Sequence, residues 1–213
     1  MRRPSTEVHT ATPDEMPRAI AAIVAAFLTD PVARFAWPSP HDHLRAMPLA
    51  TREFASGSFE YGTAYVSADF CGAALWLPPG VHANGEALER VFRDTAKPEH
   101  LEDLLATFEK MEQGHPEDPH WYLPMIGVEP NAQGRGLGAE LMRHAVTRCD
   151  QEGALAYLES SNPRNISLYL RHGFEVMGEI RIGAAPLVTP MLRRPPSCHS
   201  SLWTRAGSAK EGR

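Results

Sequence analysis

The hydrophobic and polar positions of the chain follow two periods, one typical of helices and one typical of strands. A capping box opens the first helix at Thr12, and apolar residues then recur at helical spacing up to Leu28. The same spacing predicts further helices over 43–56, 86–95, 98–111, 139–152 and 163–172. Short apolar runs between turn residues predict strands over 7–11, 61–67, 73–77, 121–128, 154–159, 174–181 and 187–193. Segment 30–40, which is rich in proline and aromatic residues, is expected to be a loop.

This order of elements predicts an α/β (α+β) fold, with a mixed central sheet and helices on both of its faces. Strands 121–128 and 154–159 are joined through helix 139–152, a connection typical of parallel neighbours. The chain has 213 residues, of which 43% are hydrophobic, and this is enough for one domain over 1–194. Residues 195–213 are dominated by Ser, Pro, Gly and cationic residues, so a disordered tail is expected there.

The most informative motif is a turn at 133–138 with three glycines, between the strand 121–128 and the helix that follows. Glycines let backbone N–H groups approach a ligand, and a helix N-terminus adds a positive potential, so this turn favours a phosphate. A P-loop is excluded because Ala139 and Glu140 stand where that motif needs lysine and a hydroxyl residue.

A dinucleotide-binding turn is a second interpretation of the same segment. Gly134, Gly136 and Ala139 match its spacing, and Glu159 lies about 20 residues on, where such folds place a ribose-binding acid. Against this interpretation, residues 129–133 separate the strand from the turn, and the motif lies late in the chain. Both observations favour another kind of phosphate site.

Two motifs together resemble the GNAT N-acetyltransferase superfamily. The first is Gln133-x-x-Gly136-x-Gly138, and the second is the run from Tyr169 to Gly173 and Phe174, which is similar to the family's Tyr-x-x-x-Gly-Phe. A helix, a strand and an asparagine-containing turn separate them in the family's order. The resemblance covers roughly residues 6 to 194 and is closest to the puromycin N-acetyltransferase-like branch. It implies the GNAT fold with a splayed central strand.

The resemblance also implies acetyl-CoA as co-substrate and assigns residues to it. The glycine turn would hold the pyrophosphate through main-chain amides, with Arg135 as an added cation. Backbone groups of the central strand and two asparagines would hold the rest of the cofactor. The implied set is Met125, Ile126, Val128, Gln133, Gly134, Arg135, Gly136, Leu137, Gly138, Asn162 and Asn165. Asn162 has an alternative role as helix N-cap before Pro163, and Gly127 fits a bulge or a close backbone approach.

Tyr169 is the candidate general acid, because a phenol can protonate the departing thiolate; the alternative is a core tyrosine beside Phe174. The general base is less clear from the sequence. Many relatives place a glutamate where this chain has Tyr122. Glu159 at the end of the next strand is the nearest alternative, with His120 as a weaker one, and a solvated strand-end carboxylate is the other interpretation of Glu159.

Composition narrows the class of protein. The net charge of −5 argues against a nucleic-acid partner. No apolar run approaches 18 residues and no secretory segment follows Met1, so a cytoplasmic protein without membrane association is expected. The three dispersed cysteines predict reduced thiols without a metal site, and Cys149 falls on a buried helix stripe, which argues against an acyl-enzyme. His41 to His43 is interpreted as solvated polar residues that open a helix.

The sequence therefore predicts an N-acetyltransferase that moves an acetyl group from acetyl-CoA directly to a primary amine of a small molecule. An antibiotic or other xenobiotic is the expected acceptor class, and the helices over 86–111 are expected to shape its pocket. Six aromatic residues are expected near the acceptor side, with core packing as the other interpretation for at least half of them: Phe27, Phe35, Trp37, Trp76, Trp121 and Tyr122. A non-catalytic acyl-CoA sensor and a peptide or protein amine acetyltransferase remain alternatives. A monomer and a homodimer are both compatible with the sequence.

Overall fold

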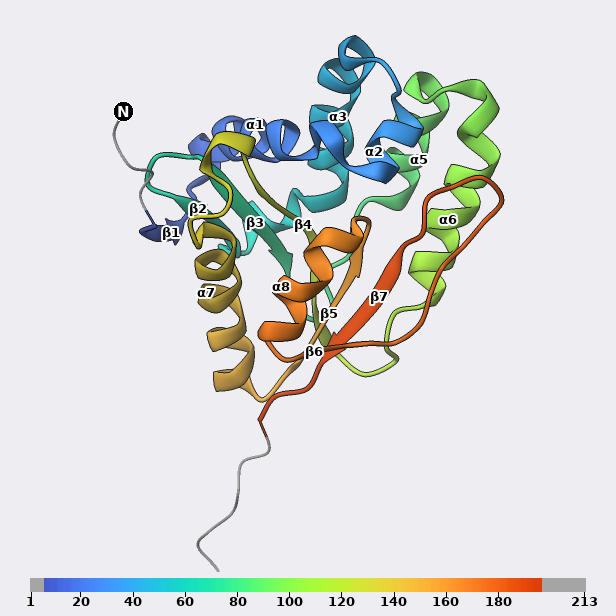
Figure 1. The fold of residues 1–213 in the computed structure, drawn as a ribbon. Coiled ribbons are helices and arrows are strands. Elements are labelled where there is room, and N and C mark those ends of the chain that lie inside the picture. Colours follow the sequence, from blue (N-terminus) through green and yellow to red (C-terminus); the bar gives the residue numbers. More distant parts are fainter. Residues whose placement is uncertain (1–5, 197–213) are drawn as a thin grey trace, which may run out of the picture.

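A seven-stranded sheet runs through the centre of the computed structural model, which describes residues 6–196 (Figure 1). Its spatial order is β1-β2-β3-β4-β5-β7-β6, and every neighbouring pair is antiparallel except β4 and β5. This confirms the mixed sheet and the parallel pair that the sequence predicts. The strands are β1 Val8–Thr10, β2 Ala64–Ser67, β3 Gly72–Leu77, β4 His120–Val128, β5 Leu155–Ser160, β6 Phe174–Val176 and β7 Thr189–Arg193.

Helices cover both faces of the sheet, and each set encloses its own hydrophobic cluster. One face carries α1 Met16–Ala26, α2 Pro31–Ala36, α3 Pro40–Ala55, α4 Gly57–Glu60, α5 Gly85–Thr95 and α6 Leu101–Gln113. The other face carries α7 Leu137–Glu152 and α8 Ile166–Arg171. Short 3₁₀ turns precede or follow several of these helices: Pro13–Glu15, Phe27–Thr29, Pro98–His100, Pro130–Ala132 and Pro163–Asn165.

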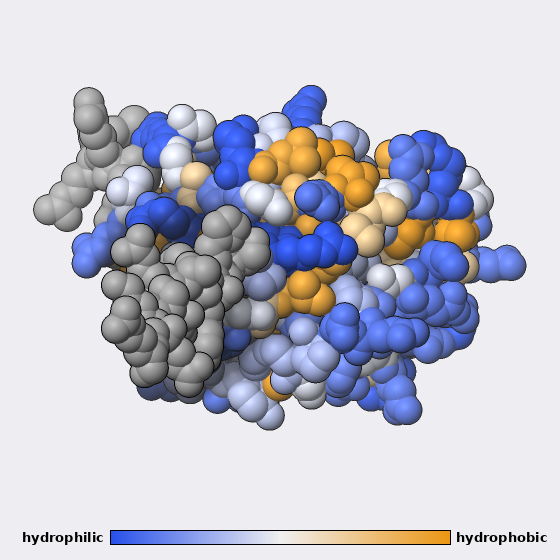
Figure 2. Space-filling model, turned by 90° about the horizontal axis from the view of Figure 1, so that it is seen from below, coloured by the Kyte–Doolittle hydropathy of each residue, from blue (hydrophilic) through white to orange (hydrophobic). Residues whose placement is uncertain are grey.

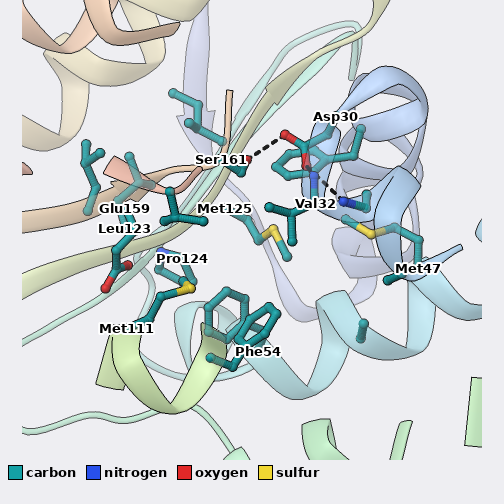
Figure 3. A pocket seen from close by; sticks show the side chains of 18 of the residues that line it. Asp30, Val32, Met47, Phe54, Met111, Leu123, Pro124, Met125, Glu159 and Ser161 are labelled. Atoms are coloured by element: carbon teal, nitrogen blue, oxygen red, sulfur yellow. Dashed lines mark hydrogen bonds between the residues drawn. The ribbon is translucent and has the colours of Figure 1, made fainter. Parts of the chain in front are cut away.

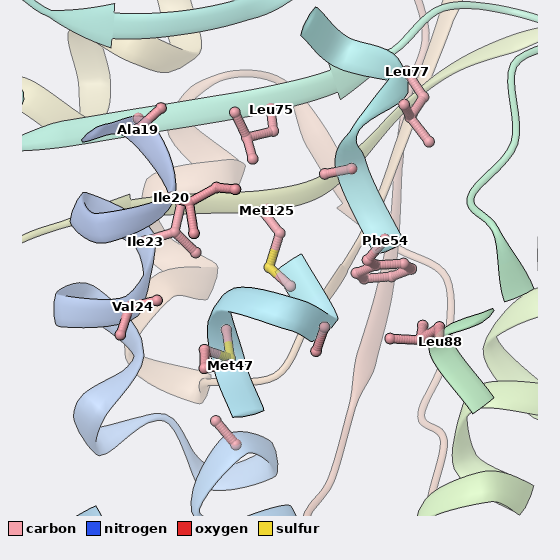
Figure 4. Close-up of a cluster of buried hydrophobic side chains, with 14 of the residues drawn as sticks. Ala19, Ile20, Ile23, Val24, Met47, Phe54, Leu75, Leu77, Leu88 and Met125 are labelled. Atoms are coloured by element: carbon pink, nitrogen blue, oxygen red, sulfur yellow. The ribbon is translucent and has the colours of Figure 1, made fainter. Parts of the chain in front are cut away.

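Strand β3 shows how one apolar run serves both faces. Leu75 and Leu77 point into the cluster beneath α1 and α3, where Figure 4 shows Leu75 close to Ile23 and Met125. Ala74 and Trp76 point the other way, into the cluster under α7. Since successive side chains of a strand alternate between faces, a strand covered on both sides has to be apolar at every position.

The central strand β4 is irregular where the site is built. Its pairing with β3 joins Leu75 to Met125 but Leu77 to Tyr122, so β4 uses one residue more than β3 over this stretch and bulges near Pro124. Its parallel pairing with β5 covers only 120–122. Beyond that point β4 and β5 are not paired, which gives the splayed central strand.

Gly127 of β4 is explained by a close approach and not by the bulge. A Cβ placed on this residue would lie 2.5 Å from the Cβ of Ala26 on α1. Only glycine lets the helix pack this close to the strand. Of the two explanations open from the sequence, close approach is therefore the correct one, and the bulge lies a few residues earlier.

Several sequence expectations need correction. Segment 30–40 is not a loop throughout, because Asp30 accepts hydrogen bonds from the backbone N–H groups of Val32 and Ala33 and so caps α2. His43 is not solvated; it is buried, with Nε2 3.1 Å from the Val24 carbonyl oxygen. The strand predicted over 174–181 ends early at Val176.

The surface is largely polar, and Figure 2 shows several apolar areas separated by hydrophilic residues on the face seen from below. The exposed large hydrophobic side chains in the described range include Leu170, Val176 and Met177. None of the helices within 6–196 combines the length and the apolar character needed to cross a bilayer. The predicted tail lies outside the described residues, apart from its first two prolines.

Candidate active site

The glycine turn has the backbone geometry that only glycine adopts readily. Gly134 and Gly136 have φ angles of 73° and 87°, and Gly136 is the N-cap residue of α7. The first N–H groups of a helix lack acceptors within it, so this end of α7 offers free donors and a positive dipole. The side chain of Gln133 donates a 2.9 Å hydrogen bond from Nε2 to the Val128 carbonyl, which ties the turn to the end of β4.

An open cleft runs along this turn. The glycine turn and the start of α7 form one wall, α8 and the turn before it form the other, and the end of β4 and the end of α1 close the floor. Nine residues of the implied cofactor set line it: Ile126, Val128, Gln133, Gly134, Gly136, Leu137, Gly138, Asn162 and Asn165. This arrangement brings the two sequence motifs to opposite sides of one cleft.

Two predicted cofactor residues lie elsewhere. Arg135 is exposed and does not line the cleft, and Met125 faces the hydrophobic cluster beneath α1 and α3. The cations that do line the cleft are Arg164 and Arg171, which the sequence analysis missed. Their signal was available, since Arg171 lies inside the Tyr-x-x-x-Gly-Phe motif. Neither arginine forms an ion pair within the described residues.

Asn162 and Asn165 differ in their local roles. The side chain of Asn162 accepts a 3.1 Å hydrogen bond from the backbone N–H of Arg164, so it caps the turn before α8, as its alternative interpretation had it. It still lines the cleft. Asn165 precedes α8, makes no side-chain capping bond there, and leaves its amide beside the cleft.

A second, mostly apolar cavity lies behind the cleft, beneath α2, α3, α5 and α6 (Figure 3). Aliphatic and aromatic side chains surround it, and the helices over 86–111 contribute to this wall as predicted. These lining residues include Val32, Trp37, Met47, Phe54, Leu88, Phe92, Phe108, Met111, Leu123 and Met125. Its polar groups are few: Asp30, Glu159, Ser161, Asn165 and Tyr169.

The aromatic residues expected near this cavity divide between roles. Phe27 and Trp37 line it. Trp76 and Trp121 belong to the cluster under α7 on the opposite face, and Phe35 stacks on His100 with ring centroids 4.0 Å apart. The aromatic wall is instead completed by residues from the neighbouring helices.

The cleft and the apolar cavity join where β4 and β5 separate. Five residues line both: Phe27, Asp30, Ile126, Asn165 and Tyr169. Because the ladder between β4 and β5 ends at Tyr122, this junction has no strand pairing to close it. The cleft and the cavity are therefore adjacent at these residues.

Tyr169 sits at this junction and also packs in the core. Its ring meets that of Phe174 edge to face, with centroids 6.2 Å apart, and its side chain is buried. Burial, and next the charge on Asp30, raises the pKa of Tyr169 above its ordinary value. The phenol therefore stays protonated at neutral pH, which a proton donor requires.

Glu159 is a buried carboxylate and not a solvated strand end. Its side chain is 1% exposed, and the imidazole Nε2 of His115 lies 3.4 Å from its Oε1. Within the described residues neither carboxylate oxygen has a hydrogen-bond partner of good geometry. Glu159 lines the apolar cavity and not the glycine cleft, so it is not placed as a ribose-binding acid.

Asp30 is the second carboxylate of the site, and the sequence analysis missed it. Its Oδ1 accepts from the N–H groups of Val32 and Ala33, and its Oδ2 accepts from the Ser161 hydroxyl at 2.5 Å. Burial raises the pKa of this carboxyl despite those hydrogen bonds. The signal in the sequence was the Asp-Pro pair, which fits an N-cap followed by a first-turn proline.

The two cysteines in the described part of the chain, Cys71 and Cys149, line neither the cleft nor the cavity. Cys149 is fully buried in the cluster under α7, and burial raises the pKa of its thiol to about 12. A protonated thiol in that position has no access to an acyl group. This geometry supports direct transfer between two bound substrates.

Comparison with known proteins agrees with this geometry. The model of the acetyltransferase (GNAT) family matches residues 100–174, which run from the start of α6 to the start of β6. An uncharacterized N-acetyltransferase of Schizosaccharomyces pombe is 29% identical over 178 residues, covering 74% of this chain and 69% of that protein. The matched family segment contains the glycine turn, Glu159 and Tyr169.

Solved structures share the whole architecture. One is histone acetyltransferase HPA2 and related acetyltransferase from Corynebacterium glutamicum, with 26% identity, a TM-score of 0.63, and coverage of 92% of this chain and 98% of that one. Another is the Drosophila melanogaster polyamine N-acetyltransferase that forms N-acetylagmatine, with 16% identity, a TM-score of 0.63, and coverage of 88% and 99%. At that lower identity the likeness concerns the fold alone.

Proposed function

We propose that this chain, a GNAT acyltransferase by its fold, its family model and its homologues, moves an acetyl group from acetyl-CoA to the primary amine of a small molecule. The observation that carries the proposal is the junction at Tyr169 and Asn165, where the cleft along the glycine turn adjoins an apolar cavity. The cleft suits a phosphate-bearing donor, and the apolar cavity suits an acceptor. A transferase needs both, with their reacting ends within reach.

The cleft residues provide the means to hold the donor. The free N–H groups at the start of α7 face its pyrophosphate, with Arg164 and Arg171 as nearby cations. Backbone groups of β4 beyond Tyr122, which β5 leaves unpaired, are available to the pantetheine arm and the thioester carbonyl. Met125 contributes through this backbone, while its side chain belongs to the cavity.

The acid and the base are assigned from their surroundings. Glu159 takes a proton from the acceptor ammonium, because no donor of good geometry occupies its carboxylate oxygens among the described residues. The phenols of Tyr122 and Tyr157 and the His115 ring are its polar neighbours. Asp30 is less suited to this role, since three donors already occupy its two oxygens. Tyr169 protonates the sulfur of the departing thiolate and is restored by solvent. Its raised pKa keeps the phenol protonated at neutral pH and also makes it a weaker acid, so it donates to the sulfur only as negative charge develops there.

The acceptor class follows from the cavity walls. Aromatic and aliphatic side chains surround it, and its charged groups are two carboxylates, Asp30 and Glu159. An apolar or flat amine with one ammonium group fits such a cavity better than a sugar with several. An aminoacyl-nucleoside antibiotic is the specific acceptor suggested by the resemblance to the puromycin N-acetyltransferase-like branch.

A thiol-release assay tests this proposal directly. Purified protein is given acetyl-CoA with 2-phenylethylamine, agmatine, puromycin and a short peptide with a free N-terminus. Release of CoA with at least one small amine, and N-acetyl product by mass spectrometry, is expected. Saturable acetyl-CoA binding without release from any amine would instead favour the non-catalytic acyl-CoA sensor, and release with the peptide alone would favour a peptide amine acetyltransferase.

A further inference from the structure

A chain of polar contacts leads from Glu159 to the protein surface. Nε2 of His115 lies 3.4 Å from Oε1 of Glu159, and Nδ1 of His115 lies 3.0 Å from Nε2 of His120. Nδ1 of His120 lies 2.8 Å from the carbonyl oxygen of Asp118, which is exposed. His115 comes from the loop after α6, while His120 begins β4. Two imidazoles thus lie between a buried carboxylate and the exposed backbone of Asp118.

The carbonyl at the outer end fixes where the protons lie. A carbonyl oxygen only accepts, so Nδ1 of His120 carries a proton and, in the neutral ring, its Nε2 is an acceptor. Nδ1 of His115 must then donate to it, which leaves Nε2 of neutral His115 without a proton and facing Glu159. Nε2 of His115 and the Glu159 carboxylate are then both acceptors and do not bond, so the chain receives a proton only after Glu159 has taken one from the acceptor.

We propose that His115 and His120 form a proton relay that carries the proton of the acceptor ammonium from Glu159 to solvent. This inference rests on the proposed function, because it takes Glu159 as the base. The His115 side chain is 19% exposed and His120 is half-buried, so both rings meet water, whereas the Glu159 side chain, at 1% exposed, does not. Both histidines position and move a proton and do not touch the reacting atoms.

The proton balance is simple. The ammonium N–H bond breaks and an O–H bond forms on Glu159, which gives a free amine and a neutral carboxyl. Nε2 of His115 takes that proton, which restores the carboxylate. Nδ1 of His115 then gives its own proton to Nε2 of His120. His120 in turn releases one proton to water. Exchange with solvent restores the starting tautomers. One proton leaves per acetyl transfer to an ammonium substrate, and no other reagent is consumed.

The groups around the relay do not compete for this proton. Tyr122 and Tyr157 flank His115, with ring centroids 4.5 Å and 4.8 Å away, and burial followed by the charge on Glu159 raises the pKa of both phenols. Burial also lowers the pKa of His120, which favours release of a proton from that ring. The other ionisable neighbours are Glu112 at the end of α6 and His82 after β3.

The relay is tested by kinetics of His115→Gln and His120→Gln, with His100→Gln as matched control. His100 also bonds a backbone carbonyl through Nδ1, at 2.7 Å from the Phe35 oxygen, and it stacks on the Phe35 ring. With 2-phenylethylamine at about pH 7, each relay variant is expected to lose about 10- to 100-fold in kcat, with KM for acetyl-CoA changed less than about threefold. The loss in kcat should be smaller near pH 9, because more of the amine then binds as the free base. It should also be smaller when imidazole is added, because a mobile base then replaces the missing ring.

A second readout is independent of turnover. In ¹⁵N NMR spectra, the neutral rings of His115 and His120 in the native chain are both expected to be Nδ1–H tautomers, because Nδ1 of each ring faces an acceptor. An Nε2–H tautomer in either neutral ring would overturn the relay whether or not the chain acetylates amines. Turnover by the native chain with unchanged kcat and pH profile in His115→Gln would overturn it as well, while absence of turnover with every amine would refute the proposed function alone.

Discussion

The hydroxyl of Ser161 donates a 2.5 Å hydrogen bond to Oδ2 of Asp30 and joins two segments that are 131 residues apart in the sequence. Ser161 follows β5, and Asp30 caps α2. This bond lies at the junction of the cleft and the cavity, and it explains how a buried carboxylate is tolerated there. It also leads to a test by pH.

Asp30→Asn is expected to change the pH dependence of stability. Burial raises the folded-state pKa of Asp30 above its ordinary value of 3.8, so the folded chain binds this proton more tightly than the unfolded chain. Native stability should therefore fall as pH rises from about 3.8 through the folded pKa, whereas asparagine does not titrate there. Urea unfolding at several pH values should show Asp30→Asn gaining stability relative to the native chain across this window.

Asp42→Asn is the control with the opposite sign. The hydrogen bond from Ser39 lowers the pKa of this exposed carboxyl, so the native chain should gain relative to the variant as pH rises through the lowered pKa towards 3.8. If the free energies of unfolding of Asp30→Asn and of the native chain changed with pH in the same way, the raised pKa of Asp30 would be contradicted.

Gly127→Ala should destabilise the fold through one methyl group. The new Cβ would meet the Ala26 Cβ at 2.5 Å, so α1 has to move away from β4. Overpacking of this kind costs about 1–3 kcal/mol in the free energy of unfolding. Gly85→Ala, at the start of α5, is the matched control because nothing lies within 4 Å of its Cβ, and it should not lose stability. Equal stability of the two variants would contradict the close packing of α1 on β4.

Gly136→Ala should weaken acetyl-CoA binding more than it weakens the fold. Its φ of 87° is unfavourable for alanine, and the turn around it carries the N–H groups that face the cleft. Gly153→Ala is the matched control, since Gly153 has a φ of 62° at the other end of the same helix. Calorimetry should show at least a tenfold rise in Kd for Gly136→Ala, about 1.4 kcal/mol, and little change for Gly153→Ala. Equal Kd values for the two variants would separate the glycine turn from cofactor binding.

The sequence predicted those parts of the site that are encoded locally. The glycine turn and Tyr169 lie in short motifs with a fixed spacing, and the structure places both on one cleft. Glu159 was found because it ends a strand next to the central one. Its burial was not predicted, because a strand-end position does not reveal that α6 and its following loop cover the side chain.

The parts that were missed depend on contacts between distant segments. His115 lies in a polar loop, and only the fold brings it to Glu159, 44 residues later by their numbers. Residue 30 was expected to begin a loop, but the structure shows that Asp30 caps α2. Arg171 lies in the same motif as Tyr169 but was not predicted as a cleft residue. Its position on the cleft depends on which side of α8 faces the glycine turn, and the motif alone does not give that orientation.

The central claim is that Tyr169 protonates the thiolate that leaves acetyl-CoA, and Tyr169→Phe tests it most directly. The change removes one hydroxyl and keeps the ring against Phe174, so the fold and acetyl-CoA affinity should be preserved. Loss of a general acid costs about 10²–10⁴-fold in the chemical step. We predict a fall in kcat of that size with acetyl-CoA, KM changed less than about threefold, and partial recovery with an aryl thioester donor, whose thiolate leaves without a proton. Near-native kcat in Tyr169→Phe, measured where chemistry limits the rate, would contradict this account and leave Tyr169 as a core residue.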